Sequence, residues 1–186
     1  MQNMDKISGM DSIKGSEDVR CAGGLTEQLS EGKQSVYSMA RLLGGRGYSK
    51  THALEESSLS LAFLGDAVWS LLVRDYFCNK TTFKNNNLHK LCTKFVKASF
   101  QAQAVESIMQ ELTEEELGVF RRARNTKMAT VSKNSSLADY KYATGFEALL
   151  GYHYLAGDFE RIQWIFERFT SSMDEALELF EKRKDK

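Results

Sequence analysis

From residue 57 to residue 182, apolar side chains recur three or four positions apart, as they do along a helix with one buried face. The whole 186-residue chain contains no proline. Proline breaks helices because it removes a backbone donor and clashes with the preceding turn, so its absence permits long uninterrupted helices. No segment shows the strict alternation of a half-buried strand. The sequence therefore predicts an all-α fold.

Start and stop signals divide this pattern into separate helices. Thr113–Glu116 forms a capping box, in which threonine and glutamate satisfy each other's unpaired amides, and Ser136 is placed to cap the helix after it. The apolar residues between 88 and 109 predict one long amphipathic helix, and Gly157-Asp158 predicts a turn. The expected helices span residues 57–77, 88–109, 113–124, 136–156 and 159–180.

The composition changes near residue 50. Eight of the 13 glycines lie between Gly9 and Gly47, and residues 1–24 are polar and aperiodic, which is typical of a disordered tail. A weak helical pattern follows at 25–43. We therefore expect an N-terminal extension over residues 1–54, largely disordered with one short helix, and a helical domain over residues 55–182.

Charge and cysteine content exclude several classes of protein. The 25 Lys and Arg residues balance the 25 Asp and Glu residues, so no overall charge points to a nucleic acid or a membrane surface. The three cysteines lack CxxC spacing, which disfavours a disulfide framework or zinc knuckle. The most apolar stretch, residues 59–73, contains an aspartate and is too short to cross a bilayer. With no apolar run at the N-terminus, we expect a cytoplasmic protein without a membrane partner.

Two acids stand in apolar surroundings: Asp66 in LSLAFLGDAVWSLL and Glu147 in YATGFEALLGY. If both segments are helical, no basic residue lies within one turn of either acid. An unpaired buried carboxylate is costly, so each must reach a wet cleft, a distant Arg or Lys, or a metal ion. Two interpretations stay open on this evidence. In the first, each acid is a surface residue or pairs with a base elsewhere in the fold. In the second, the two acids converge to hold a hard divalent cation through oxygen ligands.

The segments FLGDAVW (63–69) and FEALLGY (146–152) together resemble the catalytic domain of the ribonuclease III family. Within that family the chain is most similar to Mini-ribonuclease III, the bacterial form without a double-stranded-RNA-binding domain. Residues 85–105 and 121–155 support the resemblance, which covers about residues 59–155 well and leaves residues 1–54 unmatched. Fuller members carry two more acids, at the positions of Ala62 and Thr144 here, and Mini-ribonuclease III sequences typically lack the same two.

The resemblance implies a homodimeric endonuclease-domain helical bundle that cleaves double-stranded RNA with Mg²⁺. Asp66 and Glu147 would be both the metal ligands and the catalytic residues, and the products would carry 5′-phosphate and 3′-hydroxyl ends. Water and RNA phosphate oxygens would complete the metal shell. The implied substrate is precursor large-subunit ribosomal RNA, with a ribosomal protein as a further partner. The apolar surface of the 59–77 helix, including Leu71 and Leu72, would form the dimer seam.

Basic residues gather in two acid-free regions in spite of the zero net charge. In the first, residues 76–105, Lys90, Lys94, Lys97 and Gln101 fall on one polar stripe of the predicted helix, which is either its solvated face or an RNA contact. The second region, residues 117–138, combines cations with amides and hydroxyls that can bind phosphate or ribose. Its candidate RNA-binding residues are Arg121, Arg122, Arg124, Asn125, Lys127, Thr130, Lys133 and Asn134.

Two rival functions remain. A ribonuclease III fold can serve as a non-catalytic RNA-binding or ribosome-assembly scaffold, and such a protein could lose either acid without penalty. A plain helical interaction protein would leave the acid-free 117–138 region unexplained. The aromatic residues Phe63, Trp69, Phe95, Phe146 and Tyr152 lie at core spacing, and Cys78 and Cys92 are expected to be buried thiols.

Overall fold

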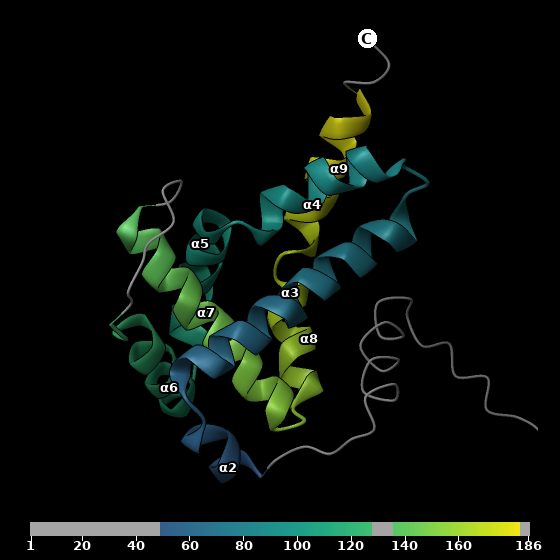
Figure 1. Ribbon diagram of the computed structural model, residues 1–186. Helices are drawn as coiled ribbons and strands as arrows, with labels where there is room; N and C mark the ends of the chain where they lie inside the picture. Colours follow the sequence, from purple (N-terminus) through teal and green to yellow (C-terminus); the bar gives the residue numbers. More distant parts are fainter. Residues whose placement is uncertain (1–48, 128–135, 183–186) are drawn as a thin grey trace, which may run out of the picture.

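The computed structural model describes residues 49–127 and 136–182, and throughout these ranges the regular elements are helices, with no strand (Figure 1). The predicted all-α fold is confirmed. The expected helix at 25–43 lies outside the described residues. In chain order the elements are α2 (Lys50–Glu55), α3 (Ser58–Lys80), α4 (Asn85–Val96), α5 (Ala98–Ile108), the 3-10 turn η1 (Met109–Glu111), α6 (Glu114–Arg124), α7 (Leu137–Leu155), α8 (Phe159–Glu167) and α9 (Thr170–Lys182).

Helix α7 runs through the centre of the domain. Between Ala143 and His153 every residue except Glu147 is buried, so this segment is enclosed on all sides, as expected of a central helix. Helices α3, α5 and α6 all pack against it, whereas α4 and α9 lie together at the far end of α3 (Figure 1). Within this buried segment, the single less buried position is therefore an acid.

Helices α3 and α7 cross with their backbones in contact. A Cβ atom added to Gly65 on α3 would overlap the carbonyl oxygen of Glu147 on α7, and one added to Gly151 on α7 would overlap the carbonyl oxygen of Leu61. Glycine is needed at both positions because any side chain would force the helices apart. This crossing fixes the segments that carry the two acids.

The core is built around Trp69 of α3, which has no exposed surface. Its ring meets Phe146 edge to face with centroids 5.1 Å apart, and Phe166 lies 5.6 Å away in a similar arrangement. The indole nitrogen of Trp69 donates a hydrogen bond to the backbone carbonyl of Phe95 (2.8 Å). A buried tryptophan needs such an acceptor, so this bond ties α3 to the end of α4.

The prediction of one helix across 88–109 was wrong. Lys97 has extended backbone angles (φ −76°, ψ 148°) and separates α4 from α5. In a continuous helix the carbonyl of Phe95 would pair with the amide of residue 99, whereas here it accepts from Trp69. The break lets Phe95 and Phe100 both pack on the Trp69 cluster, with their own ring centroids 4.9 Å apart.

Three further expectations about burial were wrong. Phe63 is 85% exposed because it lies on the face of α3 that points away from α7, and Cys78 is exposed near the end of the same helix. Leu72 is buried in the core, so of the two leucines proposed for the dimer seam only Leu71 is exposed. Helical spacing identifies a face of a helix, but it does not say which face the rest of the fold covers.

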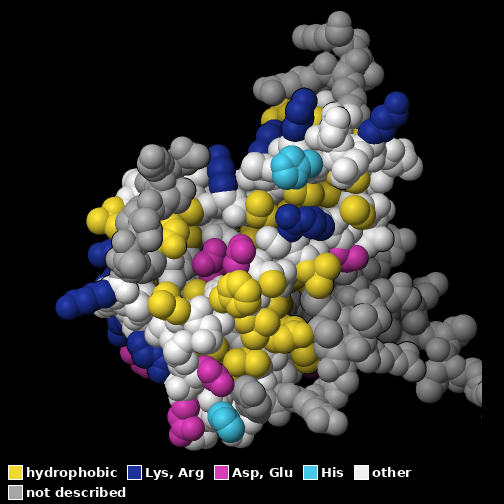
Figure 2. Space-filling view, in the orientation of Figure 1, with side chains coloured by type: hydrophobic (Ala, Val, Ile, Leu, Met, Phe, Trp, Pro, Cys, Tyr) yellow, Lys and Arg dark blue, Asp and Glu magenta, His cyan; other side chains and the backbone are white. Residues whose placement is uncertain are grey.

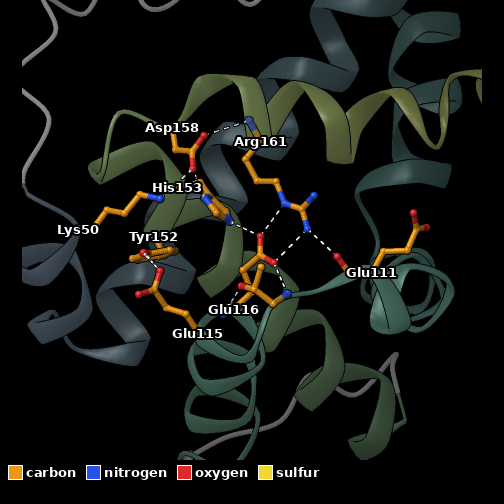
Figure 3. Close-up of polar contacts among 9 residues, drawn as sticks. Lys50, Glu111, Glu115, Glu116, Tyr152, His153, Asp158 and Arg161 are labelled. Atoms are coloured by element: carbon orange, nitrogen blue, oxygen red, sulfur yellow. Dashed lines mark hydrogen bonds and ion pairs between the residues drawn. The ribbon is translucent and has the colours of Figure 1, made fainter.

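A buried carboxylate joins α6, α7 and α8 (Figure 3). Glu116 is 3% exposed, and it accepts hydrogen bonds from the Thr113 amide, from Nε of Arg161 and from Nε2 of His153. Although burial opposes ionisation, these donors hold the pKa of Glu116 well below its usual range. The predicted capping box is confirmed, and it forms one part of this larger network.

Helix α2 packs on the same end of the domain. Ala53 is fully buried, Lys50 forms an ion pair with Asp158 (3.7 Å), and Arg122 donates a hydrogen bond to the carbonyl of Leu54 (2.6 Å). The division of the chain at residue 54 stays a prediction, and these contacts attach the segment just before it to the helical domain. Across the described part of the chain, no helix has the length and apolarity needed to cross a membrane.

Candidate active site

Asp66 and Glu147 come from the two helices that cross at the glycines. Gly65 touches the backbone of Glu147, so the neighbouring Asp66 side chain is brought to the same place on the surface. Asp66 is exposed and Glu147 is partly buried. The space-filling view shows acidic side chains (magenta) beside apolar surface (yellow), with Lys and Arg (dark blue) around them (Figure 2). Eighty residues of chain thus separate two acids that the fold brings close enough for the charge of one to act on the other.

The two carboxyl groups interact electrostatically. Burial raises the pKa of Glu147 to about 8, and the negative charge of Asp66 contributes to the rise. Burial disfavours the charged form of a carboxyl group, and a nearby negative charge adds to that effect. Both causes favour the protonated form of Glu147.

Gln101 of α5 is the third polar residue of this site. Its side chain is 1% exposed, and it interacts with the Glu147 carboxyl in the direction that lowers the pKa of that group. The contact falls short of a hydrogen bond of normal geometry, and Nε2 has no partner among the residues that the structure describes. The sequence pattern placed Gln101 on a solvated stripe with Lys90, Lys94 and Lys97. That placement was wrong, because the break at Lys97 rotates α5 relative to α4.

The donor set suits a hard cation such as Mg²⁺. Carboxylate oxygens are its preferred protein ligands, and a divalent charge would offset both the burial and the Asp66 charge that raise the pKa of Glu147. In residues 49–127 and 136–182, no group of three or more His, Cys, Asp or Glu side chains is placed to hold a metal ion. At the two positions where fuller family members have acids, Ala62 is buried, and the Thr144 hydroxyl donates to the carbonyl of Tyr140 in its own helix. Asp66 and Glu147 therefore remain the predicted ligands.

The predicted RNA-binding residues fall into two groups within the described structure. Lys94 and Lys97 are exposed, and Lys97 stands at the α4–α5 break, one turn before Gln101. At the end of α6, the guanidinium of Arg124 lies 5.6 Å from the Tyr142 ring. Arg121, Asn125 and Lys127 are exposed there too. Thr130, Lys133 and Asn134 lie outside the described residues.

Arg122 has contacts that the sequence did not reveal. Its Nε, Nη1 and Nη2 groups donate hydrogen bonds to Ser58 Oγ, the Leu54 carbonyl and the Glu56 carbonyl, respectively. These bonds hold the connection between α2 and α3 against α6. Because three of its donors are used within the fold, Arg122 has fewer left for phosphate than Arg121 or Lys127.

Comparison with known proteins agrees with this architecture. A family model for the ribonuclease III domain matches residues 59–158, a range that contains both acids. The chain belongs to the ribonuclease III family. Within the family it belongs to the Mini-ribonuclease III group, as its motifs predicted.

Two curated relatives and one solved structure show the extent of the match. The Mini-ribonuclease 3 of Thermoanaerobacter sp. (strain X514) is 46% identical over 127 residues, which cover 68% of this chain and 89% of that protein. The Mini-ribonuclease 3 of Clostridium tetani is 39% identical over 140 residues, covering 74% of this chain and 92% of that protein. A crystal structure of a Fusobacterium nucleatum protein matches with a TM-score of 0.60 and 33% identity, covering 63% of this chain and 94% of that one.

Proposed function

We propose that the protein is a Mg²⁺-dependent endoribonuclease that hydrolyses double-stranded RNA, with Asp66 and Glu147 as its metal-binding catalytic pair. The proposal rests on the meeting of these two carboxyl groups at the α3–α7 crossing, where the charge of Asp66 helps to raise the pKa of Glu147. Membership of the ribonuclease III family supports it.

The chain's own residues have distinct parts in this reaction. Asp66 and Glu147 would hold the cation, which when bound activates water and offsets charge on the scissile phosphate. Gly65 and Gly151 let α3 and α7 approach closely, and so keep the two carboxyl groups together. Hydrolysis would leave a 5′-phosphate and a 3′-hydroxyl.

The RNA would be held through its backbone. Lys94, Lys97, Arg121, Arg124 and Lys127, which all lie between the two acids in the sequence, supply positive charge. Asn125, with Thr130, Lys133 and Asn134 beyond the described residues, adds hydrogen-bonding groups for phosphate and ribose. Such contacts recognise the A-form duplex by shape and charge, so affinity should depend strongly on salt and weakly on base sequence.

A homodimer is part of the proposal. Leu59 (48% exposed), Phe63 (85%) and Leu71 (49%) form an apolar surface along α3, beside the acidic pair. A second copy of the chain that covered this surface would bring two active sites together, one for each strand. Analytical ultracentrifugation tests the proposed dimer. The wild type should sediment as a dimer, and Phe63→Lys should sediment as a folded monomer.

The substrate assignment follows the family resemblance. We propose that the enzyme matures precursor large-subunit ribosomal RNA in the cytoplasm, with a ribosomal protein as an additional partner. The alternative is a non-catalytic scaffold that binds RNA or assembling ribosomes. The acidic pair favours the enzyme, because a scaffold has no use for two carboxyl groups that repel each other.

Incubation of a long RNA duplex with the protein, with and without Mg²⁺, distinguishes these functions. We expect metal-dependent fragments from the wild type and from the control Asp139→Asn, and none from Asp66→Asn, although the last variant should still bind the duplex. Equal cleavage by Asp66→Asn would remove Asp66 from the mechanism. Duplex binding without cleavage by the wild type would favour the scaffold.

A further inference from the structure

Gln101 is a buried polar residue whose cost to the fold needs an explanation. Its side chain is 1% exposed, and the described part of the chain offers its Nε2 group no hydrogen-bond partner. Leaving a buried amide donor unpaired is destabilising, whereas an apolar side chain of the same shape would avoid that cost. Packing alone therefore favours Met or Leu at this position.

The position of Gln101 in the fold connects it to the acidic pair. It lies in the first turn of α5, where its backbone amide donates to the carbonyl of Lys97 (3.2 Å). Helix α5 packs along α7, and the Gln101 side chain faces the carboxyl group of Glu147. Gln103, two residues further along α5, is exposed, so the amide beside the acids is placed there by the fold and is not a general feature of the helix.

The chemistry of the two groups is complementary. A carboxylate offers two oxygens with about four lone-pair sites, so it can accept a hydrogen bond and still bind a cation. Groups that hydrogen-bond to metal ligands orient those ligands, and their loss typically weakens metal binding 10- to 100-fold.

We propose that Gln101 is a positioning residue, whose side-chain amide donates to the Glu147 carboxylate and holds it in the orientation that binds the cation together with Asp66. This inference rests on the proposed function, because it assigns Gln101 a part in the same metal site. Gln101 itself touches neither the cation nor the RNA in this arrangement.

The test measures metal binding directly on the full chain, with Mn²⁺ as the probe, followed by electron paramagnetic resonance and displaced by Mg²⁺. Gln101→Met keeps the size of the side chain and removes the amide, while Gln103→Met makes the same change at an exposed site. We expect about tenfold weaker Mn²⁺ binding for Gln101→Met. Binding should be unchanged in Gln103→Met and lost in Asp66→Asn.

Thermal unfolding without metal separates positioning from a structural role. Gln101→Met should unfold at the same temperature as the wild type or a higher one, because it removes a buried unpaired donor. Its RNA cleavage should require more Mg²⁺ for half-maximal rate and approach the wild-type rate when the metal saturates. A purely structural role would instead lower the unfolding temperature and leave the Mg²⁺ requirement unchanged.

The outcomes distinguish this inference from the proposed function. Wild-type affinity in Gln101→Met, with binding lost in Asp66→Asn, would overturn the role of Gln101 and leave the acidic pair in place. Binding that survives Asp66→Asn unchanged would overturn both. If Gln101→Met does not fold, NMR of the ¹⁵N-labelled wild type decides. The Gln101 side-chain amide signals should shift on addition of Mg²⁺, and signals that stay in place would refute the contact.

Discussion

Replacing Glu147 by Gln should make the metal-free protein more stable while abolishing its proposed activity. The unfolded chain has an ordinary glutamate with a pKa of 4.5, whereas in the folded protein that pKa is about 8. Between these two values the folded state binds more protons than the unfolded state, so stability must fall as pH rises across this range. For a pKa that moves from 4.5 to about 8, the loss is about 3 kcal/mol at pH 7.

Glutamine has nearly the same shape as glutamate but carries no charge, so it avoids this loss. Urea unfolding in EDTA, followed by circular dichroism from pH 5 to pH 8.5, should show Glu147→Gln more stable than the wild type by about 2–3 kcal/mol at pH 7. The difference should shrink towards pH 5. Glu106→Gln, an exposed change on α5, serves as the control and should follow the wild type.

Mg²⁺ should then reverse the order of stability. A ligand that binds only the folded state stabilises it by mass action, so the wild type should gain stability with Mg²⁺ and Glu147→Gln should gain little. A Glu147→Gln protein that is less stable than the wild type in EDTA, with the same dependence on pH, would refute this account. In that case the Glu147 carboxylate would be paired in the folded state rather than disfavoured by burial and by the charge of Asp66.

Three further predictions concern the rest of the molecule. Gly65→Ala should lower thermal stability and cleavage together, because a methyl group there overlaps the Glu147 carbonyl; an unchanged melting temperature would contradict the close crossing. Glu116→Gln should cost about 3–5 kcal/mol at pH 7 because it leaves Arg161 without its buried carboxylate. Since the pKa of Glu116 is lowered by folding, its contribution is present above about pH 4.5 and fades at lower pH, so acid titration of both proteins should converge. Lys127→Ala should weaken duplex binding similarly for all sequences and reduce its salt dependence, and a change in sequence preference in filter-binding assays would argue against backbone recognition.

Local signals in the sequence predicted many of the helix boundaries well. Ser136 caps α7 by accepting a hydrogen bond from the Asp139 amide, and Thr113 caps α6 in the expected capping box. The turn at Gly157, with φ of 71°, follows α7 as predicted. Each of these features depends on residues within a few positions of one another, so the local sequence is sufficient to predict it.

The break between α4 and α5 had no such signal. The sequence on either side of Lys97 contains no glycine or proline that would predict a break. The hydrogen bond to the free Phe95 carbonyl is donated by Trp69, 26 residues earlier in the chain. The exposure of Phe63 could not be predicted from the sequence for a related reason. Its spacing fits a buried helix face, and only the direction from which α7 approaches α3 decides that this face is left open.

The helical class, the family and the two acids as the candidate site could be predicted from the chain alone, because they follow from residue spacing and from motifs a few residues long. The packing of α3, α5 and α7 was needed to see that the charges of Asp66 and Glu147 interact, that burial and the Asp66 charge raise the pKa of Glu147, and that Gln101 is buried beside Glu147. These properties depend on distances between helices far apart in the chain and on the water those helices exclude. Neither the distances between helices nor the exclusion of water can be predicted from the spacing of residues along a single helix.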